Sequence, residues 1–138
     1  MKVEVGLGEI VDKVTILDIK VARLNPDSSA LAAHERHLLT TAWREAGLPT
    51  MSELAEWSEL ARINEALWEV EDALRDHERR GLFDASFIQQ ARSVYQLNDL
   101  RAALKRSINL RLGSDIVEQK QHPEYGMPDA TRIDDAAT

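Results

Sequence analysis

Polar residues interrupt a leucine stripe between residues 60 and 75, and this stretch carries the side chains best suited to chemistry. With about 100° of rotation per residue in a helix, Asn64 and Glu71 fall on the same face as the leucines. A carboxylate on such a face needs a cation or hydrogen-bond donors, because leaving a buried charge unpaired is strongly unfavourable. Arg75 follows Glu71 by one helical turn and is the nearest candidate cation.

Two interpretations of this polar seam are open. The seam could be a structural ion-pair network that fixes how the helices pack, since such networks need no ligand. It could instead line a pocket between helices that binds a small anion or another polar molecule. The candidate residues of the polar seam are Asp12, Lys13, Asn64, Glu71, Asp72, Arg75, Asn98, Arg101 and Lys105.

An enzymatic version of the second interpretation assigns roles to the same side chains. Glu71 or Asp72 would act as a base or hold magnesium. Arg75, Arg101 and Lys105 would hold an anionic substrate such as a phosphorylated molecule or a nucleotide sugar. No residue set in the chain defines a reaction, so the catalytic residues stay unassigned.

Four carboxylates also have the spacing of a known magnesium site. Glu53-x-x-Glu56 and Glu69-x-x-Asp72 are similar to the ExxE and ExxD motifs of the all-α nucleotide pyrophosphohydrolases, in which four carboxylates gather magnesium. One uninterrupted helix through all four positions would point the two pairs in different directions. The pyrophosphohydrolase activity is therefore a remote alternative, and we expect no metal and no cofactor.

These candidate residues need helices to position them, and the sequence predicts two in its first third. Apolar residues from 10 to 24 recur every three or four positions, which is typical of an amphipathic helix, and Asn25-Pro26 ends it. A second helix over residues 27–46 is expected to begin at a cap on Asp27 or Ser28. One side of this second helix would carry a thinner stripe made of Leu31, His34, Leu38, Thr41 or Ala42, and Glu45.

The third helix is expected to be the longest, with about thirty continuous residues from Thr50 to Arg79. Thr50-x-x-Glu53 matches the capping box that satisfies free amide donors at a helix start. No glycine or proline follows until Gly81, so nothing in the local sequence predicts a break.

Asp84 is expected to cap a fourth helix that runs to residue 112, with Phe83 packing on Ile88 as a hydrophobic staple. Only about four residues join it to the third helix, which predicts an antiparallel hairpin. One more short helical turn is expected over residues 114–120.

We therefore expect an all-α fold, an antiparallel hairpin of two long helices with two further helices packed on it as a helical bundle. Residues 1–8 would form an N-terminal arm, residues 9–120 a single helical domain, and residues 121–138 a disordered tail.

Composition narrows the class of protein. The 17 Lys and Arg residues are outnumbered by 24 Asp and Glu residues, giving a net charge of -7 that argues against nucleic acid as a partner. The chain has no cysteine, which suits a cytoplasmic location. No apolar run approaches the roughly 18 residues needed to span a membrane.

His34 and His37 lack the HExxH spacing and a clear third ligand, so a surface pair is favoured over a zinc site.

Three motifs carry a resemblance to a known family. They are Gly8-Glu-Ile-Val-Asp-Lys-Val-Thr-Ile-Leu-Asp-Ile-Lys20, Asn64-x-x-Leu-Trp-x-Val-Glu-Asp-x-Leu-Arg75, and Ala91-Arg-x-Val-Tyr-x-x-Asn-Asp-x-Arg-Ala-x-Leu-Lys-x-x-Ile-Asn109. In this order they resemble a family of small bacterial and phage proteins catalogued as a domain of unknown function. The resemblance implies that the characteristic positions of these motifs are polar residues. It implies no activity, and it suggests cell-surface polysaccharide metabolism only as an alternative function.

We expect the protein to be a binding or assembly module with a polar seam between its helices. Long helices with three tryptophans make a homo-oligomer or a protein partner plausible. The alternative is an enzyme or ligand-binding protein that acts on a small anionic molecule. Whether the protein is an enzyme stays open at this point.

Overall fold

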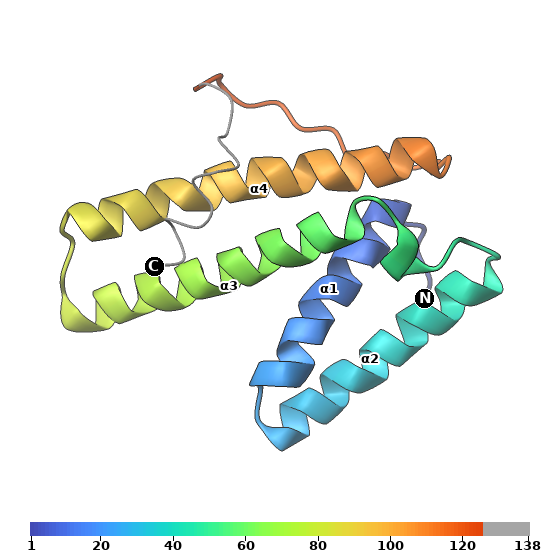
Figure 1. Cartoon of the computed structure of the whole chain (residues 1–138), viewed down its shortest axis with the longest axis horizontal. Coiled ribbons are helices and arrows are strands. Elements are labelled where there is room, and N and C mark those ends of the chain that lie inside the picture. The colour runs from blue at the N-terminus through green and yellow to red at the C-terminus, as the bar shows by residue number, and fades with distance from the viewer. Residues whose placement is uncertain (126–138) are drawn as a thin grey trace. The chain divides into compact units, whose positions relative to one another are not determined.

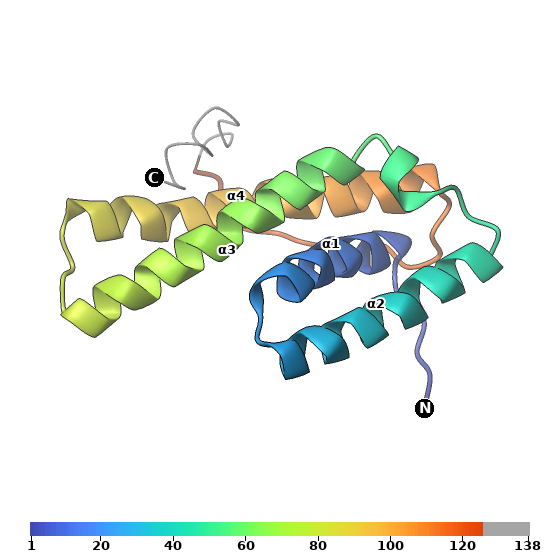
Figure 2. The same ribbon diagram turned by 60° about the horizontal axis from the view of Figure 1, so that its bottom comes forward.

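The computed structural model describes residues 1–125, most of which are helical (Figures 1 and 2). No β-strand occurs among these residues, and the predicted all-α helical bundle is confirmed. Residues 126–138, which hold most of the predicted disordered tail, lie outside the described residues. The elements in chain order are α1 (Leu7–Arg23), α2 (Pro26–Glu45), the 3₁₀ turn η1 (Met51–Glu53), α3 (Trp57–Arg80) and α4 (Ala85–Arg111).

The contacts of the chain divide it into two compact units. Of the described residues, the first unit consists of Met1–Ala61 and Leu104–Glu118, and the second of Arg62–Ala103 and residues 119–125. Helices α1 and α2 therefore belong to the first unit, whereas α3 and α4 contribute residues to both. The first unit joins the start of the chain to the end of α4.

Helices α1 and α2 pack as an antiparallel pair in the first unit (Figures 1 and 2). The cap at the start of α2 is Asn25, whose side-chain oxygen accepts a hydrogen bond from the Ser28 amide at 3.0 Å. Pro26 occupies the first helical position, where its missing amide donor costs nothing. The prediction of Asp27 or Ser28 as the cap was wrong, because a helix that begins at the proline takes its cap from the preceding residue.

The buried face of α2 differs from the predicted one. Leu31 is 73% exposed and Leu38 is 55% exposed, so the stripe that contains them faces away from the core. The buried residues of α2 are instead Ala32 and Trp43, the latter only 4% exposed. Burying a single indole removes so much apolar surface from water that it outweighs two leucines in setting the orientation of the helix.

Helix α3 begins later than predicted because the chain breaks before it. The 3₁₀ turn η1 ends at Glu53 and is followed by Leu54, whose ψ of 138° is extended. Helix α3 starts at Trp57 and runs for 24 residues. The side chain of Thr50 makes no capping hydrogen bond, so the predicted capping box does not form. Because of this break, Met51 and Leu54 are buried in the core. Their burial depends on contacts with distant segments of the chain, so the local sequence does not reveal it.

In the second unit, residues 62–80 of α3 and 85–103 of α4 form the predicted antiparallel hairpin (Figures 1 and 2). Asp84 caps α4 as predicted, since its Oδ1 accepts a hydrogen bond from the Phe87 amide at 3.1 Å. Phe83 packs edge-on against Phe87, with ring centroids 5.1 Å apart. The predicted staple on Ile88 was wrong, because that side chain is exposed.

No helix forms over residues 114–120, contrary to the prediction. Ser114 uses its hydroxyl to bond the Ile116 carbonyl at 2.8 Å, a local bond that competes with helix formation. Further on, the Tyr125 hydroxyl donates a hydrogen bond to Asp99, and its ring packs edge-on against Tyr95.

The core of the first unit combines residues from all its segments. Gly8 is where α1 meets the end of α4, and a Cβ added there would lie 2.3 Å from the carbonyl oxygen of Lys105. The Gly8 amide donates to Oδ1 of Asn109 at 2.7 Å, and the Leu7 amide donates to Oγ of Ser114 at 3.2 Å. These bonds replace the missing side-chain cap of α1. The core residues are Val11, Val14, Trp43, Met51, Leu54, Leu60 and Ile108.

We expect Gly8→Ala to destabilise the protein by roughly 1–3 kcal/mol, the usual cost of forcing extra volume into a packed site. The sign of the change in unfolding free energy is informative, because alanine at an unobstructed helical position stabilises a protein by up to about 1 kcal/mol relative to glycine. The free energy of unfolding from urea titrations measures the difference. An unchanged or more stable variant would contradict the close approach of α1 to Lys105.

Candidate binding pocket

Three residues of the predicted polar seam lie in the first unit, and two of them pair with acids of that unit. Nζ of Lys13 lies 2.6 Å from Glu35, and both side chains are about half exposed. Nζ of Lys105 lies 2.5 Å from Glu9 and 3.4 Å from a carboxylate oxygen of Glu118. Asp12 is buried.

The other six residues of the polar seam lie in the second unit. Asn64 is 4% exposed, as expected for a seam residue. Arg75 pairs with Glu71 at 3.5 Å, one turn along α3 as predicted, but the Glu71 side chain is 45% exposed. The expectation of a buried carboxylate at Glu71 was therefore wrong. Ile63, Ala66, Leu67 and Val70 are buried, so the buried face of α3 is turned away from position 71.

Asn98 and Arg101 lie one turn apart on α4. Nη1 of Arg101 donates to Oδ1 of Asn98 at 3.5 Å, within α4. Asp72 is exposed. Within residues 1–125, no group of three or more His, Cys, Asp or Glu side chains is placed to hold a metal ion.

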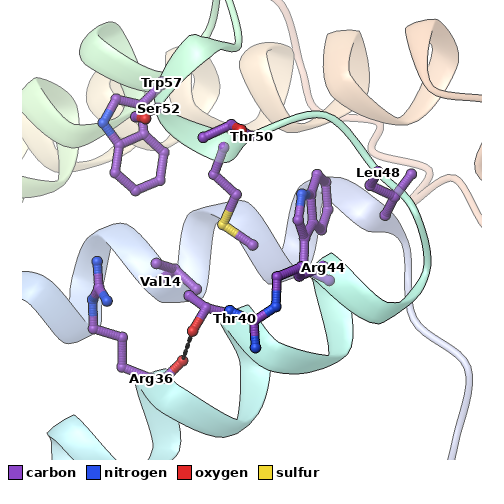
Figure 3. Close-up of a pocket in the computed structure, with 10 residues that line it drawn as sticks. Val14, Arg36, Thr40, Arg44, Leu48, Thr50, Ser52 and Trp57 are labelled. Carbon is purple, nitrogen blue, oxygen red and sulfur yellow. Dashed lines mark hydrogen bonds between the residues drawn. The ribbon is translucent and has the colours of Figure 1, made fainter.

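A pocket of about 280 Å³ opens in the first unit at a place the sequence did not predict (Figure 3). One wall is a ridge of α2 in which Arg36, Thr40 and Arg44 follow one another at four-residue spacing. Trp57, Ser52 and Thr50 form the opposite wall. The other lining residues are Val14, Trp43, Leu48 and Met51.

The apolar part of the pocket is held in place by the core. Val14 and Met51 are buried core residues that also line the pocket. The Trp43 indole donates a hydrogen bond through Nε1 to the Pro49 carbonyl at 2.7 Å, which fixes the ring orientation. Trp57 is partly buried and packs against the same core. The apolar surface is therefore preformed.

The two arginines of the pocket differ in their pairing. Nε of Arg36 donates to Oδ1 of Asp18, so that guanidinium is already neutralised by a carboxylate of α1. The Arg44 side chain makes no ion pair or hydrogen bond to any residue in the described chain. Thr40 gives its hydroxyl proton to the Arg36 carbonyl at 2.9 Å, whereas the Thr50 hydroxyl makes no capping bond (Figure 3). Arg44 is thus the available cation of the pocket.

The turn that carries Trp57 is anchored by Glu56, a buried carboxylate that is 6% exposed. Arg111 of α4 donates to both of its oxygens, and the Ser107 hydroxyl donates to Oε1 at 3.0 Å. Burial alone would raise the pKa of Glu56, but the hydrogen bonds from Arg111 and Ser107 outweigh it and hold the pKa below its ordinary value.

The model of a family of unknown function (DUF6165) matches residues 1–133. The chain belongs to this family. No curated protein and no solved structure matches the chain. Membership agrees with the resemblance found in the three sequence motifs, and it leaves the activity to be argued from the pocket.

Sequence reasoning missed the pocket because it assigned the wrong face of α2 to the core. The spacing of Arg36, Thr40 and Arg44 was visible in the sequence, but a basic ridge on a helix is usually solvated. The ridge lines a pocket only because residues 48–57 fold back over it. The predicted uninterrupted helix from Thr50 excluded that arrangement. In the described chain no helix is long and apolar enough to cross a membrane.

We expect Glu56→Gln to lower the free energy of unfolding by roughly 1–3 kcal/mol at pH 7, the usual range for hydrogen bonds to a charged group. The pKa of Glu56 is lower in the folded than in the unfolded chain, so its contribution is present above the ordinary value of 4.5. That contribution is lost as the pH falls through the folded-state pKa. The difference between wild type and variant should therefore shrink in acid.

Urea titrations at several pH values measure this difference. Glu53→Gln is the matched control, because Glu53 is exposed three residues earlier in the same turn. A stability difference for Glu56→Gln that stays constant down to pH 3, or one shared by Glu53→Gln, would contradict the role of this ion pair.

Proposed function

We propose that the protein is a binding module and that its site is the pocket of the first unit. The observation that carries this proposal is Arg44, an arginine without a partner in the described chain at the edge of an apolar pocket. A guanidinium so placed attracts an anionic group, and the hydroxyls of Thr50 and Ser52 across the pocket add hydrogen-bond donors. The ligand class is a small anionic molecule.

The composition of the pocket favours binding over catalysis. Its lining contains no Asp, Glu or His, so no lining side chain is suited to act as a general base near neutral pH. The volume of about 280 Å³ lies just below the roughly 300–1,000 Å³ typical of pockets for drug-sized ligands. A nucleotide sugar would insert only one of its ends.

Assembly is the second candidate function. Leu31 and Leu38 are both exposed and lie seven residues apart on one face of α2. This spacing is that of a helix seam, so a second copy of the chain is the partner that the face would suit.

The polar seam is a separate proposal, and we assign it a structural role. Asn64 is buried in the second unit, and Arg101 bonds Asn98 on α4. Buried polar groups of this kind restrict how helices pack, because a shifted register leaves them unsatisfied. The exposed pair of Glu71 and Arg75 would contribute little to stability.

A thermal-shift screen tests the binding function. Nucleotides, sugar phosphates and organic acids are added separately, and a compound that binds only the folded state raises the melting temperature. We expect an anionic compound to stabilise wild type by about 2.7 kcal/mol when present at 100 times its Kd. Arg44→Gln should lose at least tenfold in affinity because it removes the available cation.

Arg106→Gln is the matched control, since Arg106 is an exposed arginine of the first unit outside the pocket lining. It should bind like wild type. Stabilisation that survives in Arg44→Gln would reject the pocket as the site. No stabilisation by any compound, together with a mass that rises with protein concentration, would favour assembly instead.

A further inference from the structure

We infer that the pocket of the first unit selects a monoanionic aromatic acid, with its carboxylate at Arg44 and its ring against Trp57. This inference rests on the proposed binding function and narrows its ligand class. Three properties of the pocket lead to it: its net charge, its donors and its aromatic wall.

The charge of the lining suits a single negative charge. Arg36 and Arg44 are its only ionised side chains, and Asp18 neutralises Arg36. One positive charge is left for a ligand. A dianion such as a phosphate monoester carries one negative charge more than this cation balances.

The donors of the pocket suit a planar carboxylate. A guanidinium presents a fixed fork of N–H groups that matches two carboxylate oxygens. Arg44 ends the α2 ridge, and the hydroxyls of Ser52 and Thr50 lie on the opposite wall (Figure 3). Two N–H groups of the Arg44 guanidinium can therefore donate to both oxygens of one carboxylate.

The remaining surface suits an aromatic ring. Two indoles line the pocket, and the thioether of Met51 adds a polarisable contact that is favourable beside aromatic groups. Trp57 is only partly buried, which leaves part of its ring available for stacking. At roughly 30 Å³ for each water-sized group, the pocket holds on the order of ten non-hydrogen atoms, the size of one ring with a short acidic side chain.

Isothermal titration calorimetry with four probes of similar size tests this inference. The probes are 3-phenylpropionate, its neutral amide, phenyl phosphate and the aliphatic acid octanoate. We expect 3-phenylpropionate to bind at least tenfold more tightly than each of the others. The amide lacks the charge, the phosphate carries excess charge, and octanoate lacks the ring.

Two variants connect these affinities to the two contacts. Arg44→Gln should remove the preference for 3-phenylpropionate over its amide. Trp57→Phe should weaken the binding of 3-phenylpropionate by a larger factor than the binding of octanoate, because a smaller ring offers less stacking surface. Far-UV circular dichroism and the melting temperature verify that both variants fold, and the conservative Trp57→Phe change preserves most of the buried apolar surface.

A wrong ligand class and a wrong binding function give different results in these experiments. If phenyl phosphate or octanoate binds more tightly than 3-phenylpropionate and still depends on Arg44, the ligand class is wrong while the binding function stands. If none of the three anions binds, and no compound of the thermal-shift screen does, the binding function itself is rejected together with this inference.

Discussion

The close approach of α1 to the end of α4 is the contact on which the first unit depends. Gly8 lies against the backbone of Lys105, where a side chain of any size would collide. This proximity lets Asn109 and Ser114 accept the amide hydrogens at the start of α1, separated from them by about a hundred residues of chain. The contact places α1, and Val14 on it, at the base of the pocket.

A second constraint acts on the chain between α2 and α3. Glu56 accepts hydrogen bonds from Arg111 and Ser107, and this buried pair fixes the turn directly before Trp57. Burying a carboxylate is unfavourable unless it is paired, so the turn and the end of α4 stabilise one another. The result is a pocket wall that is already formed, and a preformed wall lowers the entropic cost of the proposed ligand binding.

Local signals predicted much of the fold. The amphipathic pattern of residues 10–24, the Asn25-Pro26 break and the Asp84 cap correctly gave the helices, because each acts over a few residues of chain. The face of α2 and the start of α3 could not be predicted in this way. They depend on contacts of Trp43, Met51 and Leu54 with distant segments of the core. The pocket is built from these two elements, so the sequence predicted polar residues without revealing where a ligand would fit.

The first unit contains several cations that are paired with acids and one cation that is available to a ligand. The cations Lys13, Lys105 and Arg111 are paired with acids of their own unit, whereas Arg44 has no partner in the described chain and lines an apolar pocket. The proposed binding site rests on this unpaired charge beside an aromatic surface. Family membership fixes what the chain is related to, and this pocket is the basis for proposing what it does.

The most direct measurement follows the three tryptophan indole signals in ¹H–¹⁵N correlation spectra while 3-phenylpropionate is added. Trp43 and Trp57 line the pocket of the first unit, and Trp68 lies in the second unit and serves as an internal reference. The account predicts that the Trp43 and Trp57 signals shift with one shared Kd while the Trp68 signal stays in place. A shift of the Trp68 signal alone, or no shift of any indole at saturating acid, would contradict it.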